Sequence, residues 1–286
     1  MTVVAIIAQG MMGAGVGRRL HETGAEVRTL LAGRSGASAE RAAKAGMRPA
    51  ADERALLAGA DFFLSILPPG EAEALARRLG PALTALDKKP VYVDCNAVSP
   101  KTAIRIAAAV APTGADFVDG GIIGGPPRPG YSPTIYASGE QARQAAVLRD
   151  WGIDWRIVDG PVGAASALKM SYAGITKGTT AIASAMLLGA ARFGCGEALI
   201  AELSESQPEM LARMGSGIPR MYDKAYRWVA EMEEISDFLE QNPPSRDIYA
   251  AVARLYDYLA TAYDEKVPGP GNAVKTLDRI LAHARD

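Results

Sequence analysis

The chain opens on a short β-branched segment that runs into a glycine turn. The sequence VVAIIAQGMMGAG, at residues 3–15, carries Ala8, Gly10 and Gly13 at the spacing G-x-G-x-x-G. In such a turn the second glycine lets a pyrophosphate approach the backbone, and the third lets helix and strand pack closely. Alanine is acceptable at the first position if its φ is negative. The pattern therefore predicts a dinucleotide-binding turn. The alternative is a glycine-rich turn that binds no ligand. The residues expected to bind the cofactor are Ala8, Gly10, Met11, Met12 and Gly13.

The end of the second predicted strand indicates which dinucleotide is bound. An NAD-binding chain carries Asp or Glu about 20 residues past the turn, where it binds the ribose hydroxyls. Here the sequence is LLAGRSG, with Arg34 and Ser35 and no acid. A guanidinium and a hydroxyl suit a 2′-phosphate. We therefore expect NADPH to be preferred over NADH; the alternative is a solvated surface arginine.

Lys169 is the candidate for proton transfer. A lysine can take a hydroxyl proton and return it when partial burial lowers its pKa. Its apolar neighbours make partial burial plausible: Ala165, Ala167, Leu168 and Ala173. From spacing alone, a helix lysine that extends to solvent is the favoured alternative.

A second candidate follows the strand predicted at residues 91–94. Asn96 and Ser99 lie just past its carboxyl end, where ligands of open α/β sheets collect. Ser99 before Pro100 has the pattern of a helix N-cap. We therefore assign Ser99 mostly to the cap, and Asn96 to the cofactor or the substrate.

An α/β fold must position these residues. Helical stretches alternate with predicted strands at residues 3–7, 26–31, 61–67, 91–94, 115–120, 134–138 and 155–158. This alternation predicts a mostly parallel, doubly wound sheet. From Gly163 the chain is predicted to be all-α, beginning with one helix to Arg192. The segment VDGPVG marks a boundary near Gly160, which divides a Rossmann domain (1–160) from a helical domain (161–286).

Composition excludes several classes of function. The 286 residues carry a formal net charge of -1, without the basic excess typical of nucleic-acid binding. Cys95 and Cys195 fit no disulfide framework and no metal spacing. Residues 178–191 lack charge, but they are shorter than the roughly 20 residues that span a bilayer. We expect a cytoplasmic protein without nucleic-acid, membrane or metal partners.

Four further segments follow the glycine turn in a familiar order: SILPP (65–69), VDCNAVSP (93–100), VDGGIIGGPP (118–127) and GAASALKMSYAGITKG (163–178). The chain resembles the β-hydroxyacid dehydrogenases, the group related to 3-hydroxyisobutyrate dehydrogenase and 6-phosphogluconate dehydrogenase. The resemblance implies hydride transfer between NADPH and a small alcohol or carbonyl substrate. It also implies that the loops of Leu67, Pro68 and Asn96 lie along the nicotinamide. The turn of Ile123, Gly124 and Gly125 is then expected to bind the substrate. Lys169 is expected to exchange a proton with the substrate hydroxyl.

The chain departs from the family pattern at two places. Ile123 replaces a serine of the substrate turn, and Ala173 replaces an asparagine four residues after the helix lysine. Tyr172 and Lys177 are nearby polar candidates for the site. An imine reductase and a non-catalytic NADPH-binding protein are therefore alternatives. The segment RWVAEMEEI (227–235) resembles a subgroup whose C-terminal domain is poorly characterised.

The resemblance also implies a homodimer formed through the helical domain. A helix from Gly163 to Arg192 would be about 45 Å long at 1.5 Å per residue, too long for one small bundle to cover. Glycines at positions 174, 178 and 189 leave room for close helix approach.

Overall fold

The computed structural model describes the fold of residues 1–266. These residues divide into two compact units, one ending at Met170 and the other beginning at Ser171. The division falls inside helix α6 (Ala164–Arg192), whereas the boundary predicted near Gly160 lies just before that helix begins. The predicted domain limits stay a prediction, and residues 267–286 of the second one lie outside the described part.

The first unit is built on an eight-stranded sheet with the order β3-β2-β1-β4-β5-β6-β7-β8. Every neighbouring pair is parallel except β6 and β7. The mostly parallel sheet expected from the sequence is therefore confirmed. The strands are β1 (Val3–Ile7), β2 (Glu26–Leu30), β3 (Arg48–Ala50), β4 (Phe62–Ser65), β5 (Val91–Asp94), β6 (Phe117–Ile123), β7 (Thr134–Ser138) and β8 (Asp154–Ile157).

Two strands differ from the expectation. Strand β3 was not predicted, because its three residues, Arg-Pro-Ala, lack the apolar alternation of a strand; as an edge strand it tolerates its proline. Strand β6 runs to Ile123, beyond the predicted end at Gly120. Antiparallel pairing with β7 extends it, since Ile122 lies opposite Ile135 and Ile123 lies opposite Thr134.

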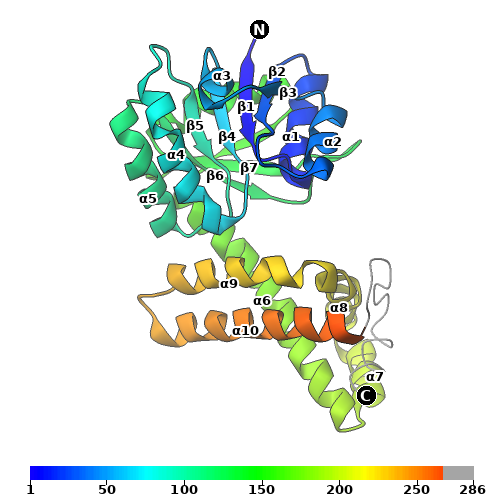
Figure 1. Cartoon of the computed structure of the whole chain (residues 1–286). Coiled ribbons are helices and arrows are strands. Elements are labelled where there is room, and N and C mark those ends of the chain that lie inside the picture. Colours follow the sequence, from blue (N-terminus) through cyan, green and yellow to red (C-terminus); the bar gives the residue numbers. More distant parts are fainter. Residues whose placement is uncertain (267–286) are drawn as a thin grey trace. The chain divides into compact units, whose positions relative to one another are not determined.

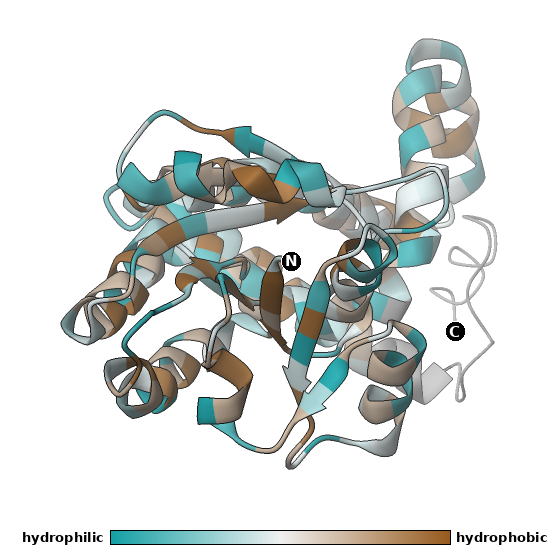
Figure 2. Cartoon of the chain, turned by 90° about the horizontal axis from the view of Figure 1, so that it is seen from above, coloured by the Kyte–Doolittle hydropathy of each residue, from teal (hydrophilic) through white to brown (hydrophobic). Residues whose placement is uncertain are grey.

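Helices cover both faces of the sheet (Figure 1). Alternate residues of β1 enter different cores, Val4 and Ile6 on one face and Ala5 and Ile7 on the other. This two-sided burial explains the near-continuous apolar sequence of the inner strands, and Figure 2 shows brown segments among the strands of the sheet. The first core is covered by α1 (Met11–Glu22), α2 (Gly36–Lys44) and the 3₁₀ helix η3 (Glu140–Trp151), and the second by α3 (Glu53–Leu57), α4 (Ala72–Thr84) and α5 (Pro100–Val110).

The second unit is helical, as the sequence predicts. The long helix expected at residues 163–192 is confirmed by α6, which is 29 residues long. No helix in the described part of the chain is long and apolar enough to cross a membrane. The remaining helices are α7 (Gly196–Ser206), α8 (Pro208–Met221), α9 (Ala225–Phe238) and α10 (Pro243–Lys266), with short 3₁₀ turns η1 (Pro69–Glu71), η2 (Ala111–Thr113) and η4 (Tyr222–Lys224).

Two glycines of α6 have a role that the sequence did not reveal. A Cβ at Gly174 or Gly178 would lie 3.0 or 3.1 Å from the hydroxyl of Tyr249 on α10. The space beside these two glycines is therefore occupied by Tyr249 of the same chain. Only Gly189, of the three glycines singled out in the sequence, has open space around its Cβ position.

Candidate active site

The glycine turn lies where the strand order of the sheet reverses. Strand β1 has β2 on one side and β4 on the other, which makes the carboxyl ends of β1 and β4 the switch point of the fold. The Ala8 amide donates to the Ile66 carbonyl at 2.9 Å. The structure thus brings the predicted turn and the loop of Leu67 and Pro68 together at the edge where ligands of such sheets bind.

The two retained glycines occupy positions that suit their predicted roles. A Cβ at Gly13 would lie 1.8 Å from the Ala8 carbonyl oxygen, so only glycine allows α1 to approach β1 this closely. A Cβ at Gly10 would meet nothing within 4 Å, and no side chain caps α1. The first amides of this 12-residue helix thus face an open approach, which fits a pyrophosphate. No non-glycine residue of the described chain has positive φ, so the condition on Ala8 is met.

The end of β2 forms a polar cluster beside this turn. Ser35 caps α2 by accepting from the Ser38 amide at 3.3 Å. Arg41, which sequence reasoning missed, donates from Nε to the Gln9 carbonyl at 2.9 Å and from Nη2 to Ser38 Oγ at 3.0 Å. The partly buried Arg34 precedes this cap. Arg41 lies one helical turn after Ser38, and that spacing was the available signal.

Asn96 holds the loop that follows β4. Its side-chain oxygen accepts from the Leu67 amide at 2.6 Å, and its Nδ2 donates to Ser65 Oγ at 2.8 Å and to Asp94 Oδ1 at 2.5 Å. The side chain is buried. Asn96 therefore positions the Leu67 loop, and its predicted contact with cofactor or substrate stays a prediction. The predicted N-cap is confirmed, since Ser99 Oγ accepts from the Thr102 amide at 3.3 Å.

Asp94 is buried with an incomplete set of partners. Its Oδ2 has no hydrogen-bond partner among the described residues. Burial raises the pKa of Asp94 to about 7, and the charge of Asp119 acts in the same direction, against the hydrogen bonds from Asn96. The carboxyl end of β5 therefore disfavours additional negative charge.

Asp119 on β6 anchors the start of α6. Its Oδ2 accepts from the Gly163 amide at 2.9 Å, from the Ser166 amide at 3.1 Å and from Ser138 Oγ at 2.9 Å. Its Oδ1 accepts from Ser166 Oγ at 2.6 Å. A buried carboxylate from a distant strand thus satisfies the helix amides that a local N-cap would otherwise bind. Sequence reasoning missed this role because the partners lie 44 and 47 residues away.

Lys169 lies over β6 because of a second glycine. A Cβ at Gly121 would lie 3.0 Å from the Ala165 carbonyl oxygen and 3.0 Å from Lys169 Cβ. Asp119 and Gly121 both face the first turns of α6. Alternate residues of a strand share a face, so Ile123 lies on this same face of β6. The structure therefore places the predicted catalytic lysine on the same face of β6 as the first residue of the predicted substrate turn.

The predicted substrate turn, Ile123 to Gly125, carries no polar side chain of its own. Gly124 has φ +127°, a conformation that favours glycine. A Cβ there would lie 2.3 Å from the hydroxyl of Tyr131, and the Gly125 amide donates to that hydroxyl at 3.0 Å. Tyr131 is thus a further residue of this turn that sequence reasoning missed; nothing in the local spacing indicated it.

The remaining polar candidates belong to the helical unit. Lys177 forms an ion pair with Glu231 on α9, with both side chains largely buried, and its ammonium lies 4.9 Å from the centre of the Trp228 ring. Tyr256 donates to the Lys177 carbonyl at 2.5 Å. In this network the positive charge of Lys177 is balanced by the carboxylate of Glu231. Tyr172 is half-exposed and Ala173 is buried, and their predicted place in a substrate site stays a prediction.

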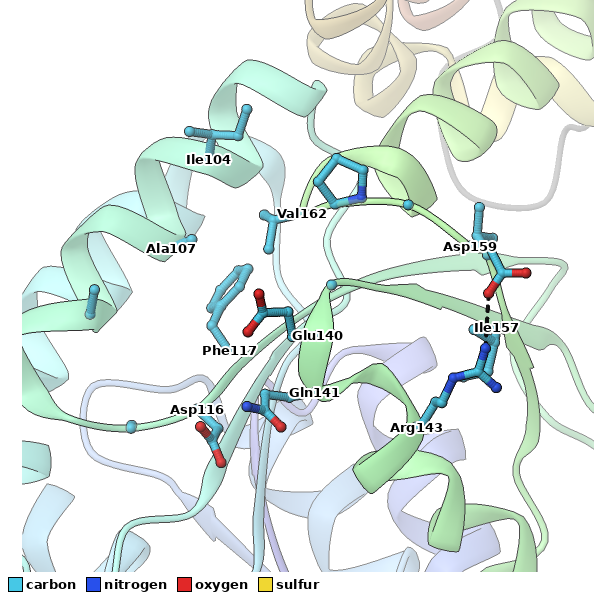
Figure 3. Close-up of a pocket in the computed structure, with 16 residues that line it drawn as sticks. Ile104, Ala107, Asp116, Phe117, Glu140, Gln141, Arg143, Ile157, Asp159 and Val162 are labelled. Carbon is cyan, nitrogen blue, oxygen red and sulfur yellow. Dashed lines mark hydrogen bonds and ion pairs between the residues drawn. The ribbon is translucent and has the colours of Figure 1, made fainter.

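A groove of about 900 Å³ lies elsewhere in the sheet unit (Figure 3). Ile104, Phe117 and Val162 supply apolar contacts, and the ion pair of Arg143 and Asp159 is exposed to solvent. None of the predicted site residues lines it. Among residues 1–266, no group of three or more His, Cys, Asp or Glu side chains could hold a metal ion.

The chain is similar to several known proteins whose function is not established. A domain of unknown function, DUF1932, matches residues 190–259. An uncharacterized 28.5 kDa protein from the 7S RNA 5′ region of Methanothermus fervidus is 30% identical over 182 residues, which is 64% of this chain and 68% of that protein. A conserved protein of unknown function, reported to resemble 3-hydroxyacid dehydrogenases, is 29% identical with a TM-score of 0.69, covering 91% of this chain and 97% of its own.

Other solved structures share the fold. A conserved hypothetical protein from Sinorhizobium meliloti is 26% identical with a TM-score of 0.72, covering 100% of this chain and 96% of its own. The 3-hydroxyisobutyrate dehydrogenase of Mycobacterium tuberculosis, solved with L-serine, is 18% identical (TM-score 0.68; 100% of both chains). An imine reductase from Myxococcus stipitatus with NADP⁺ is 20% identical (TM-score 0.54; 100% of both chains). These last two likenesses show the fold alone.

The resemblance noted in the sequence is thus confirmed over the sheet unit. The family model that describes the NAD binding domain of 6-phosphogluconate dehydrogenase matches residues 3–150, from the first residue of β1 into η3. This range contains the glycine turn, the Leu67 loop and strand β6. The chain belongs to the family of the NAD-binding domain of 6-phosphogluconate dehydrogenase.

Proposed function

We propose that this protein is an NADPH-dependent oxidoreductase that interconverts an alcohol and a carbonyl compound of the β-hydroxyacid type. The observation that carries the proposal is the placement of Lys169 over Gly121, on the face of β6 that leads to the turn of Ile123 to Gly125. A bound nicotinamide cofactor supplies the hydride transfer. Lys169 takes the hydroxyl proton during oxidation and returns it to the carbonyl oxygen during reduction.

The glycine turn and the Asn96 network position the reaction in this proposal. The open N-terminus of α1 binds the pyrophosphate, with Gly10 allowing its close approach and Gly13 allowing α1 to pack closely on β1. Asn96 holds the Leu67 amide, so that the loop at the end of β4 keeps a fixed shape beside the cofactor. Rigid positioning of this kind keeps the reacting groups in an orientation that favours the reaction.

A substrate screen tests the proposal. Purified protein would be assayed spectrophotometrically with NADPH against 2- and 3-oxo acids, aldehydes and cyclic imines, and with NADP⁺ against 3-hydroxyisobutyrate and L-serine. We expect reduction of an oxo acid or aldehyde and oxidation of a hydroxy acid. Turnover of imines alone would identify an imine reductase instead. Tight NADPH binding without any turnover would identify a non-catalytic binding protein, the alternative favoured by Ile123 and Ala173.

The preference for NADPH is proposed from the end of β2. Arg34 and Ser35 supply a guanidinium and a hydroxyl, and Arg41 adds a second guanidinium joined to Gln9 and Ser38. A charge-assisted pair with phosphate contributes roughly 1.5 to 3 kcal/mol, or about 10- to 100-fold in affinity. Titration of both nucleotides should therefore show a preference for NADPH that Arg34→Ala reduces by that factor. An unchanged preference in the variant would remove Arg34 from the site.

We also infer a homodimer that forms through the helical unit. Five large apolar side chains recur at intervals of three, four or seven residues along α6 and just beyond it, which places them on one face of a helix. They are exposed, and Gly189 on the same stripe leaves open space. The stripe consists of Tyr172, Ile175, Ile182, Met186 and Phe193. Light scattering at micromolar concentration should give a dimer mass, and Ile182→Lys should yield monomer. A strictly monomeric wild-type protein would contradict this inference.

A further inference from the structure

The loop that follows the substrate turn carries a hydroxyl back to it. Residues Arg128 to Tyr131 form a tight turn in which Arg128 and Tyr131 exchange both backbone hydrogen bonds, at 3.0 and 2.9 Å. Pro129 and Gly130 occupy its centre, and Gly130 has φ +73°, as a type II turn requires. The sequence of this turn therefore sets the direction in which Tyr131 leaves the backbone.

The same loop is fixed to the helix that begins at the glycine turn. Arg19 on α1 donates from Nη2 to the carbonyls of Arg128 and Tyr131, each at 3.4 Å. Pro127 lies against Gly15 so closely that a Cβ there would be 2.8 Å from its ring. The backbone of Tyr131 is thus held by α1 and by its own turn. A loop held in this way loses little entropy when it binds a ligand.

The hydroxyl of Tyr131 retains a proton to donate. The Gly125 amide donates to its oxygen at 3.0 Å, which uses one acceptor position and leaves the phenolic O–H as a donor. The guanidinium of Arg128 lies 5.1 Å from the centre of the Tyr131 ring. Tyr131 is 36% exposed and Arg128 is exposed as well, so a ligand can reach both groups.

A hydroxyl donor with a guanidinium near its ring is suited to a carboxylate ligand. The oxygens of an ionised carboxylate accept hydrogen bonds from both groups. They lie at a turn that otherwise has only Ile123 and two glycines. We propose that Tyr131 is a substrate-binding residue, which donates its phenolic hydrogen bond to the carboxylate of a small hydroxy or oxo acid, with Arg128 supplying the positive charge. This assignment rests on the proposed function and names the substrate class of its site.

Equilibrium binding tests the assignment without requiring turnover. The protein is saturated with NADPH, which cannot oxidise an alcohol, and is titrated by calorimetry with 3-hydroxyisobutyrate and, separately, with its uncharged methyl ester. Tyr131→Phe should weaken binding of the acid by about 10- to 100-fold, the effect of one hydrogen bond to a charged group. Affinity for the ester and for NADPH should stay within about twofold of the wild type.

Two further variants separate ligand binding from loop structure. Tyr226→Phe is the matched control, since Tyr226 on α9 is also exposed, with the Arg227 guanidinium 5.6 Å from its ring centre, but belongs to the helical unit; it should leave acid binding unchanged. Ile123→Ser in the Tyr131→Phe background returns a hydroxyl to the turn and should recover part of the affinity for the acid. A merely structural role of Tyr131 would not respond to this rescue.

The outcomes are distinct. Equal affinity of Tyr131→Phe and wild type for the acid would overturn the assignment, and so would an equal loss of acid and ester binding. A wild-type protein that binds NADPH but neither probe would overturn it as well, while the nucleotide site stands. Failure of the wild type to bind either NADPH or NADH would overturn the proposed function, and this assignment with it.

Discussion

Two lysines on helix α6 lie eight residues apart in very different surroundings. Lys169 belongs to the sheet unit, where Gly121 lets its Cβ come close to β6 and Asp119 holds the first turn of the helix. Lys177 belongs to the helical unit, where Glu231 pairs with its ammonium and Trp228 lies beneath it.

The difference shows how position, rather than residue type, gives a lysine its role. The ammonium of Lys177 is compensated by a carboxylate with only 17% of its side chain exposed, so its charge stabilises the packing of α6 against α9. Lys169 is placed through the backbone of its helix, at the carboxyl edge of a sheet. We expect chemistry from Lys169 and stability from Lys177, and the following variants test that contrast.

Asp119→Ala should have the largest effect, because it removes the anchor of the Lys169 end of the helix. Two buried amides and two hydroxyls would lose their acceptor, which should lower the free energy of unfolding by about 3 kcal/mol or more. Urea unfolding measures this change. The exposed Asp116, three residues earlier, is the control, and Asp116→Ala should change stability by less than about 0.5 kcal/mol. Equal stability of the two variants would contradict the anchoring role.

Lys169→Ala should lower turnover by about 10²-fold or more, since general acid–base groups typically contribute 10²- to 10⁴-fold. NADPH affinity, measured by nucleotide fluorescence, should be nearly unchanged. Lys177→Ala should retain turnover with the same substrate. The opposite result, with Lys177→Ala inactive and Lys169→Ala active, would show that the roles of the two lysines are reversed.

Lys177→Met should reduce the free energy of unfolding by about 2 kcal/mol, because Glu231 would keep its charge in a largely buried position without a partner. Glu231→Gln in the same background should recover part of the loss. A double-mutant cycle from urea unfolding gives the coupling energy between the two side chains. Coupling below about 0.3 kcal/mol would mean that the ion pair does not stabilise the helical unit.

Asp94→Asn should change the pH dependence of stability in the sheet unit, where burial raises the pKa of this carboxyl to about 7. The folded state binds the proton more tightly than the unfolded state, so this contribution is complete below about pH 4 and is lost as the pH rises toward 7. The slope is at most about 1.4 kcal/mol per pH unit.

Unfolding at pH 5 and pH 8 tests this assignment, because the salt-bridged carboxyls with lowered pKa values, such as Glu73 and Asp61, lose their contribution only at more acidic pH. The wild type should be less stable at pH 8, and the difference should shrink in Asp94→Asn. An identical difference in both proteins would show that Asp94 stays ionised. Such a result would also weaken the contrast between an uncompensated acid in the sheet unit and a compensated pair in the helical unit.

The sequence by itself determined the features that depend on neighbouring residues. Short-range residue spacing was sufficient to predict three of them: the glycine turn, the N-cap at Ser99 and the long helix from residue 164. The parallel sheet follows from the alternation of strand and helix patterns. These features are local, so backbone preferences and apolar periodicity are sufficient to predict them.

Only the tertiary structure decided which side chains meet across the sheet and between helices. Asn96 holds the Leu67 amide across 29 residues, Asp119 caps α6 across 44 and 47, and Glu231 neutralises Lys177 across 54. A hydrogen bond requires a short distance and a favourable angle, and both depend on the order of the strands and the register of their pairs. Spacing along the chain contains neither quantity, which is why the sequence named Lys169 but not Gly121 and Asp119, which hold its helix in place.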